Sequence, residues 1–191
     1  MELFSGFRLK IGKSILEKKI SRIRRKILYD DISSIKKIGI VWDATRTRDF
    51  VSLSRFHQKM QERNVDVKII GYYPGKELPD QYTAIRFLSI IRRKELSFFY
   101  IPVSTEADVY MNSRFDVLID INFDKEFTLH YITALSAASF KVGLFNSEAD
   151  STVFDLMIEI KRPVQVENYL DQVIHYLEMI NSGTTLKAVN Q

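Results

Sequence analysis

Short apolar runs alternate with amphipathic stretches along this chain. The runs are rich in β-branched and aromatic residues, which predicts strands at 37–42, 65–72, 98–101, 115–121, 140–145 and 154–160. Apolar residues at steps of three or four predict helices at 49–64, 82–91, 106–112, 126–138 and 166–177. This alternation is typical of an α/β fold, so we expect a three-layer, Rossmann-like, mostly parallel sheet with helices on both faces.

The N-terminal residues predict one more helix, because apolar residues recur along them at short steps. These residues are Phe4, Phe7, Ile11, Ile15, Ile20, Ile23 and Ile27. A polar stretch at 29–34 then interrupts the pattern. We therefore expect a basic amphipathic helical arm at 1–28, an α/β domain at 36–181 and a polar tail at 182–191.

Charge separates the arm from the rest of the chain. Its first 26 residues hold nine Lys and Arg against two Glu, a net charge of +7, whereas the other residues carry a net charge of −3. The most closely spaced basic residues are expected to face an anionic surface: Lys18, Lys19, Arg22, Arg24, Arg25 and Lys26. The arm fits protein (its own domain or a second copy in a homo-oligomer), an anionic membrane, or nucleic-acid phosphate.

Several patterns that known chemistries require are missing from the sequence. There is no cysteine, which excludes disulfides and thiolate metal sites. The seven glycines form neither GxGxxG nor GxxxxGK[ST], so neither a dinucleotide site nor a P-loop is expected. The three histidines stand singly, without the spacing of a zinc site. No cofactor is therefore predicted outside the alternative function given below.

Apolar run length bears on localisation. No run approaches the roughly 20 residues that cross a bilayer, and charges interrupt any secretory signal at the N-terminus. We expect a cytoplasmic protein, with an arm able to hold it at the membrane periphery.

Polar residues follow the first and the fourth predicted strands. In an open α/β sheet, ligands bind outside the carboxyl ends of the strands. This rule makes Thr45, Arg46 and Asn122 candidate ligand-binding residues and Asp43 a candidate catalytic residue. Asp and Asn after a strand also commonly cap the next helix, and this structural role is the competing interpretation.

The letters DATRT after the first strand and DINFD after the fourth are similar to the first and last motifs of haloacid-dehalogenase-like phosphotransferases. The resemblance implies Asp43 as the nucleophile, with Asp120 and Asp124 helping to hold Mg²⁺. Thr45 stands where that family has the second aspartate of its first motif. A Mg²⁺-dependent phosphotransferase or phosphohydrolase using Asp43 is therefore the alternative function.

Residues 114–144 also resemble a strand–helix–strand unit in the N-terminal half of heptosyltransferase-type glycosyltransferases, which we interpret as shared fold rather than shared activity. A broader resemblance spans nearly the whole chain. The basic N-terminal helix, IGIVWDAT, FDVLIDINFDKEFTLHYITALSAASFKVGLF and FDLMIEI with its helix resemble an uncharacterised Bacteroidetes family, a domain of unknown function. This resemblance implies a small cytoplasmic α/β protein without an assigned activity. We expect a non-catalytic binding or interaction module whose arm docks on protein or on an anionic surface.

Overall fold

A computed structural model describes residues 3–29, 32–145 and 153–181 of the 191-residue chain. The predicted tail at 182–191 lies outside this part. Within the described residues, six parallel strands form one sheet in the order β3-β2-β1-β4-β5-β6, which confirms the predicted α/β fold. The strands are β1 (Lys37–Asp43), β2 (Asp66–Tyr73), β3 (Leu88–Arg92), β4 (Val117–Ile121), β5 (Phe140–Leu144) and β6 (Leu156–Ile158).

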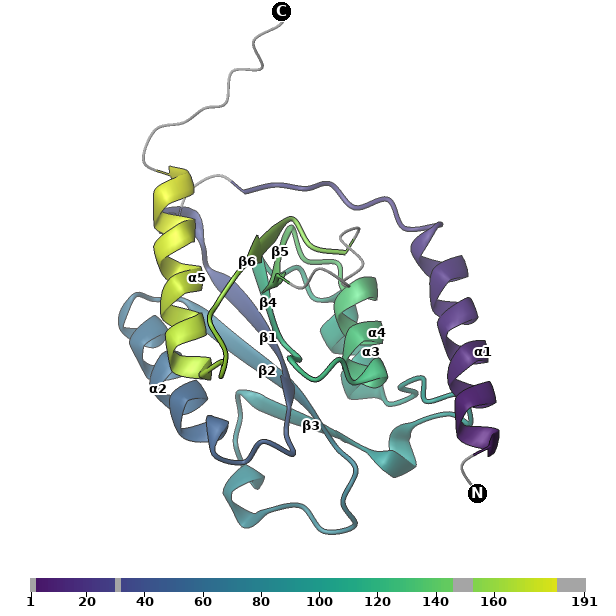
Figure 1. Cartoon of the computed structure of the whole chain (residues 1–191). Coiled ribbons are helices and arrows are strands. Elements are labelled where there is room, and N and C mark those ends of the chain that lie inside the picture. Colours follow the sequence, from purple (N-terminus) through teal and green to yellow (C-terminus); the bar gives the residue numbers. More distant parts are fainter. Residues whose placement is uncertain (1–2, 30–31, 146–152, 182–191) are drawn as a thin grey trace, which may run out of the picture.

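Helices cover both faces of this sheet (Figure 1). They are α1 (Leu3–Ile20), α2 (Asp49–Glu62), α3 (Thr105–Asn112), α4 (Phe127–Leu135) and α5 (Val166–Asn181). α2 and α5 lie on one face, and α3 and α4 lie on the other. α1 lies outside α4 and adds a further layer on that side.

The central strands divide their side chains between two apolar clusters. In β4, Val117, Ile119 and Ile121 face the cluster under α2 and α5, whereas Leu118 faces the cluster under α3 and α4. All four side chains are fully buried. A parallel strand buried on both faces is a continuous apolar run, so the sequence predicts β1, β4 and β5 to within two residues.

The sheet has one point at which the order of its strands reverses. The chain moves outward from β1 to β3 and then returns to place β4 on the other side of β1. Val41 pairs with Asp120 and Trp42 with Ile121, so the segments that follow β1 and β4 begin side by side. Ligands of open α/β sheets bind at such a switch point, and the candidate ligand residues are therefore found there.

Two predicted elements are wrong. The predicted helix at 82–91 is a 3₁₀ turn at Asp80–Tyr82 followed by β3. Pairing with β2 draws these residues into the sheet, although their apolar spacing is helical. The predicted strand at 98–101 is a loop, in which Tyr100 has a φ of 61°, outside the β region.

The arm is helical only in its first part. α1 ends at Ile20, and between it and β1 the described residues form only one short 3₁₀ helix, Ile32–Ser34 (Figure 1). Several tertiary contacts hold this crossing segment, among them the ion pair of Arg25 with Asp155 and the hydrogen bond from the Leu28 N–H to the Ser139 carbonyl at 3.2 Å. The helical arm predicted to residue 28 is therefore too long, because spacing alone does not reveal contacts with distant residues.

Candidate functional site

The carboxylate of Asp43 accepts hydrogen bonds from within its own turn. Asp43 is the last residue of β1 and is buried. Its Oδ1 accepts hydrogen bonds from the Thr45 N–H at 3.0 Å and from the Thr45 hydroxyl at 2.7 Å. This is an Asx turn, so the structure brings a candidate catalytic residue and a candidate ligand residue together as turn partners.

Arg46 connects the two sides of the switch point. Its Nε donates to Oδ2 of Asp49 at 2.7 Å, and a terminal nitrogen lies 3.4 Å from Oδ2 of Asp124. Its guanidinium also lies over the Phe123 ring, 5.4 Å from the centroid. A candidate ligand residue and a candidate metal ligand, Arg46 and Asp124, are thus each other's partners.

Asp120 lies under α4 and is buried. Its carboxylate accepts from the Thr133 hydroxyl at 2.5 Å and from the Asn122 N–H at 2.7 Å. Burial raises the pKa of Asp120 to about 6, although these hydrogen bonds and the nearby charge of Lys141 lower it. The Asn122 side chain bonds the backbone N–H and carbonyl of Glu126, the N-cap residue of α4, so it serves the start of this helix.

The three aspartates of the haloacid-dehalogenase resemblance therefore have separate partners. Asp43 bonds Thr45, Asp120 bonds Thr133, and Asp124 pairs with an arginine. Across the described ranges, no group of three or more His, Cys, Asp or Glu is arranged to hold a metal ion. The geometry thus gives the Mg²⁺-dependent alternative no support.

Lys141, in β5, is a second buried ionisable group on the α4 side. It is only 2% exposed, and its Nζ donates to the Ala134 carbonyl near the end of α4 at 3.0 Å. Burial lowers the pKa of Lys141 to about 7, and the charge of Arg25 lowers it further, whereas Asp155 and Asp120 raise it. Desolvation is thus the largest cause of the pKa shift in both Asp120 and Lys141.

We expect these two groups to give opposite pH dependences of the unfolding free energy. Between pH about 4 and about 6, the folded chain holds the Asp120 proton and the unfolded chain does not, so stability falls as pH rises. Between pH about 7 and about 10, the unfolded chain holds the Lys141 proton and the folded chain does not, so stability rises with pH. Urea unfolding at a series of pH values measures both slopes.

The variant Lys141→Met isolates the second slope. It removes the titrating amine and keeps an unbranched chain of similar length, so the rise in stability between pH about 7 and about 10 should flatten relative to the parent chain. Parallel stability curves for the two proteins over this window would contradict the assignment to Lys141.

The structure separates the six arm residues that we expect to face an anionic surface. Lys19 donates from Nζ to the Tyr131 hydroxyl at 2.7 Å, and Arg25 forms two 2.7 Å bonds with Asp155. These two side chains therefore have partners in the domain, although Lys19 is exposed. The other four are also exposed: Lys18, Arg22, Arg24 and Lys26.

α1 packs on the domain through a face to which the predicted stripe contributes only Ile20. Leu16 is 3% exposed, and Leu9 and Ile20 pack against the same apolar cluster under α4. Gly12 lies close to the domain backbone, since a β-carbon added there would lie 2.5 Å from the Phe99 carbonyl oxygen. We term this the packed face of α1.

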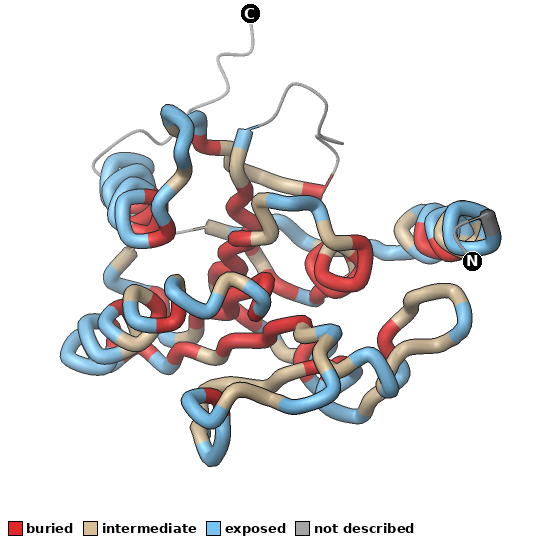
Figure 2. The backbone as a smooth tube through the Cα atoms, turned by 60° about the horizontal axis from the view of Figure 1, so that its bottom comes forward, coloured by how far each residue is buried: buried red, intermediate tan, exposed pale blue. Residues whose placement is uncertain are grey.

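The first part of the predicted stripe forms a second apolar face. Phe4, Phe7, Ile11 and Ile15, here termed the outer stripe, lie roughly 140° around the helix from the packed face, at 3.6 residues per turn. Phe4 is 74% exposed and Phe7 is 63% exposed, whereas the two isoleucines are partly buried. Figure 2 shows exposed residues on the side of α1 that points away from the domain.

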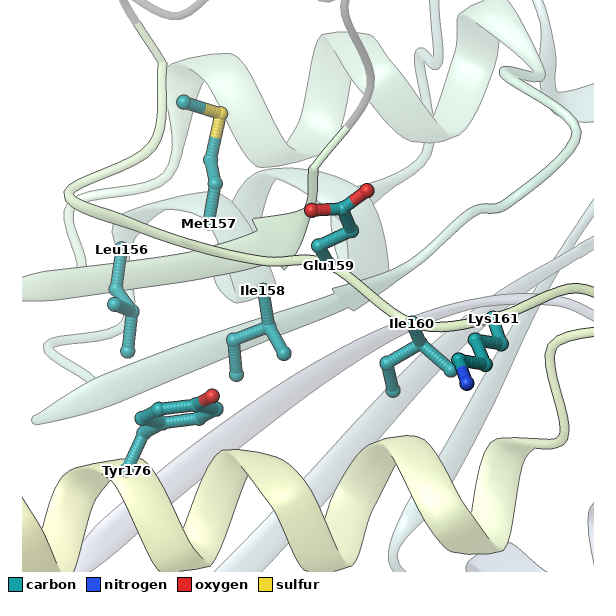
Figure 3. A pocket seen from close by; sticks show the side chains of 7 residues that line it. All are labelled: Leu156, Met157, Ile158, Glu159, Ile160, Lys161 and Tyr176. Atoms are coloured by element: carbon teal, nitrogen blue, oxygen red, sulfur yellow. The ribbon is translucent and has the colours of Figure 1, made fainter.

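A separate hollow of about 590 Å³ lies at the β6 edge of the sheet (Figure 3). Residues 156–161 and Tyr176 of α5 line it. β6 spans only three residues, fewer than the predicted strand at 154–160, and the exposed Glu159 and Lys161 follow it. Short strands and charged side chains keep sheet edges from pairing with a further strand. We therefore interpret this hollow as part of a protected sheet edge rather than as a ligand site.

Sequence analysis did not single out three residues that make notable contacts in the structure: Arg8, Gly12 and Lys141. A glycine inside a predicted helix indicates a close approach of another backbone, and a lysine inside an apolar strand indicates a buried charge. Both signals are present in the sequence. Arg8 offers no such signal, because its partners lie 90 residues or more away.

Comparison with known proteins identifies the family to which this chain belongs. A search of curated proteins finds no match. The profile of a family described as "Family of unknown function (DUF6913)" matches residues 8–180. This span includes the packed face of α1, the whole sheet and nearly all of α5. The predicted resemblance to a domain of unknown function is thus confirmed, and the chain belongs to this family of unknown function, DUF6913.

Proposed function

We propose that this protein is a non-catalytic interaction module that docks on an anionic membrane surface through the outer stripe of α1. One observation carries the proposal: α1 already packs on the domain through one face, yet it keeps Phe4 and Phe7 in solvent on another. A helix that only covers its own domain needs a single apolar face. The second face therefore calls for another apolar environment.

The charge of α1 favours an anionic partner. Lys10, Lys13 and Lys18 are exposed and form no salt bridge within the described part of the chain. An apolar helix face with unpaired lysines around it is the combination that binds the interface of anionic bilayers. Phosphate binding to nucleic acid would use the lysines but leave the two phenylalanines unexplained.

Membrane docking by α1 requires insertion only into the interface. None of the described helices combines the length and the apolar content that crossing a bilayer requires. A helix lying in the headgroup region enters the bilayer by only about 5–10 Å, and it needs apolar residues on one side alone. The outer stripe meets this condition.

We expect Phe7→Ser to weaken binding to vesicles of phosphatidylcholine and phosphatidylserine about tenfold, because one aromatic side chain no longer leaves water. Vesicle flotation of the full chain measures the bound fraction. Val51→Ser is the matched control, since Val51 is an exposed apolar residue (55%) on α2, away from α1, and this change should leave binding unaltered.

Two results would contradict membrane docking. The parent chain could fail to float with anionic vesicles, or Phe7→Ser and Val51→Ser could bind alike. Light scattering of the same proteins tests the competing occupant, because a dimer that Phe7→Ser dissociates would show that a second copy covers the outer stripe.

A further inference from the structure

The loop at 97–101 is a tight turn with Phe98 at its tip. The Ser97 N–H donates to the Ile101 carbonyl at 2.7 Å, and the Ser97 hydroxyl accepts from the Ile101 N–H at 3.2 Å. Tyr100 adopts a φ of 61°, which turns the chain back. These bonds fix the loop while leaving the Phe98 side chain 64% exposed.

Arg8 attaches this loop to α1. Its Nε donates to the Phe98 carbonyl at 2.6 Å. Its guanidinium lies 4.1 Å from the centroid of the Phe98 ring and 4.5 Å from that of the Tyr100 ring. The absence of a side chain at Gly12 lets the Phe99 carbonyl approach the helix one turn further along. The loop and α1 are therefore in direct contact at two successive turns of the helix.

This contact extends the outer stripe with a residue from a distant part of the sequence. Phe4 lies one helical turn from Arg8 on the same side of α1, and Phe98 lies against Arg8. Three highly exposed phenylalanines, Phe4, Phe7 and Phe98, thus lie around one arginine. The terminal nitrogens of Arg8 hold no hydrogen bond to any residue of the described ranges.

We propose that Arg8 and Phe98 form a lipid-headgroup site, in which the terminal nitrogens of Arg8 bind a phospholipid phosphate and Phe98 enters the bilayer beside Phe7. This inference rests on the proposed docking of α1 and names a second inserting element and the group that recognises the headgroup. Guanidinium donors bind phosphate in a paired geometry. The Phe98 and Tyr100 rings beside the guanidinium favour a position near the lipid phosphates, since aromatic rings with a polar neighbour prefer the membrane interface.

Fluorescence of the full chain with Phe98→Trp tests the insertion. The natural chain has one tryptophan, Trp42, which is fully buried and therefore serves as an internal reference. With vesicles that contain brominated phosphatidylserine, we expect quenching of the new tryptophan. Val51→Trp on α2 is the control, and its emission should remain unquenched.

Binding of variants tests the headgroup contact. Phe98→Ser should lower the affinity for phosphatidylserine vesicles about tenfold. Arg8→Lys keeps the charge but loses the paired donors and the stacking between two rings. It should therefore reduce the quenching of Phe98→Trp when the two changes are combined. Circular dichroism and Trp42 emission confirm that each variant is folded.

The outcomes separate this inference from the proposed function. If Phe7→Ser weakens binding while Phe98→Ser binds like the parent and Phe98→Trp stays unquenched, α1 docks alone and the headgroup site is overturned. If Arg8→Lys leaves the quenching unchanged, Arg8 has no part in the site. If the parent chain binds no anionic vesicle, both proposals fail. Binding of bulk RNA that Phe98→Ser removes would also overturn the lipid assignment, because Phe98 would then stack on bases.

Discussion

Replacing Arg25 with methionine is expected to lower the unfolding free energy by about 3 kcal/mol, a value typical of breaking a buried ion pair. The guanidinium and the carboxylate of Asp155 form two 2.7 Å bonds, and their side chains are only 14% and 7% exposed. Arg25→Met keeps the aliphatic bulk but leaves the carboxylate of Asp155 buried without its cation. Urea unfolding followed by far-ultraviolet circular dichroism measures the loss.

The neighbouring arginine provides the control for this experiment. Arg24 is exposed, so Arg24→Met should change the unfolding free energy by no more than about 0.5 kcal/mol. Adding Asp155→Asn to Arg25→Met should recover part of the stability, because it removes the isolated charge. Equal stabilities for the Arg24 and Arg25 variants would show that the pair does not hold the crossing segment in place.

We expect Gly12→Ala to destabilise the docking of α1 by about 2 kcal/mol, within the usual range for overpacking. The added methyl group would lie 2.5 Å from the Phe99 carbonyl oxygen and 3.0 Å from the Phe127 ring. The carbonyl belongs to the backbone of the fixed loop, so it cannot move aside as a flexible side chain would. Amide hydrogen exchange should therefore show loss of protection in α1 with little change in the sheet.

Gly6 is the matched site for the opposite result. It also lies within α1, but a β-carbon added there would meet no atom within 4 Å. Gly6→Ala should thus stabilise α1, by up to about 1 kcal/mol, because alanine has the higher helix propensity. Loss of α1 protection in both variants, or in neither, would contradict the close contact at Gly12.

Burial on both faces made the centre of the sheet predictable. Every residue of β4 is buried, so the predicted run at 115–121 matched this strand closely. The edge of the sheet was harder to predict. In β3, four of five residues are partly exposed, and their apolar spacing resembles that of a helix. Only pairing with β2, which residue spacing does not encode, decides between the two structures.

The N-terminal arm shows why charge alone could not identify the residues that face an anionic surface. The sequence counts Lys19 and Arg25 with their neighbours, but their partners, Tyr131 and Asp155, lie more than 100 residues away. Spacing indicates an apolar stripe along α1, yet it cannot state which of two apolar faces meets the domain. Leu16 is the residue that decides this question, since it alone is buried among the apolar side chains of α1 whose burial is described.

The pairing of β1 with β4 brings together the two segments that hold the candidate residues at the carboxyl edge. Their hydrogen bonds could not be predicted. Thr45 closes the turn of Asp43, and Asn122 holds the start of α4, which are the capping roles that compete with ligand binding at such positions.

α1 and the α2–α5 layer lie on opposite sides of the molecule (Figure 1). A bilayer against the outer stripe would therefore give every copy the same orientation, with α2 and α5 turned toward the aqueous phase. That side carries ion pairs between the two helices, Lys59 with Asp171 and Arg63 with Glu178. A chain anchored in this way becomes a two-sided connector, in which lipid holds one side and the opposite side is displayed to whatever approaches from solution.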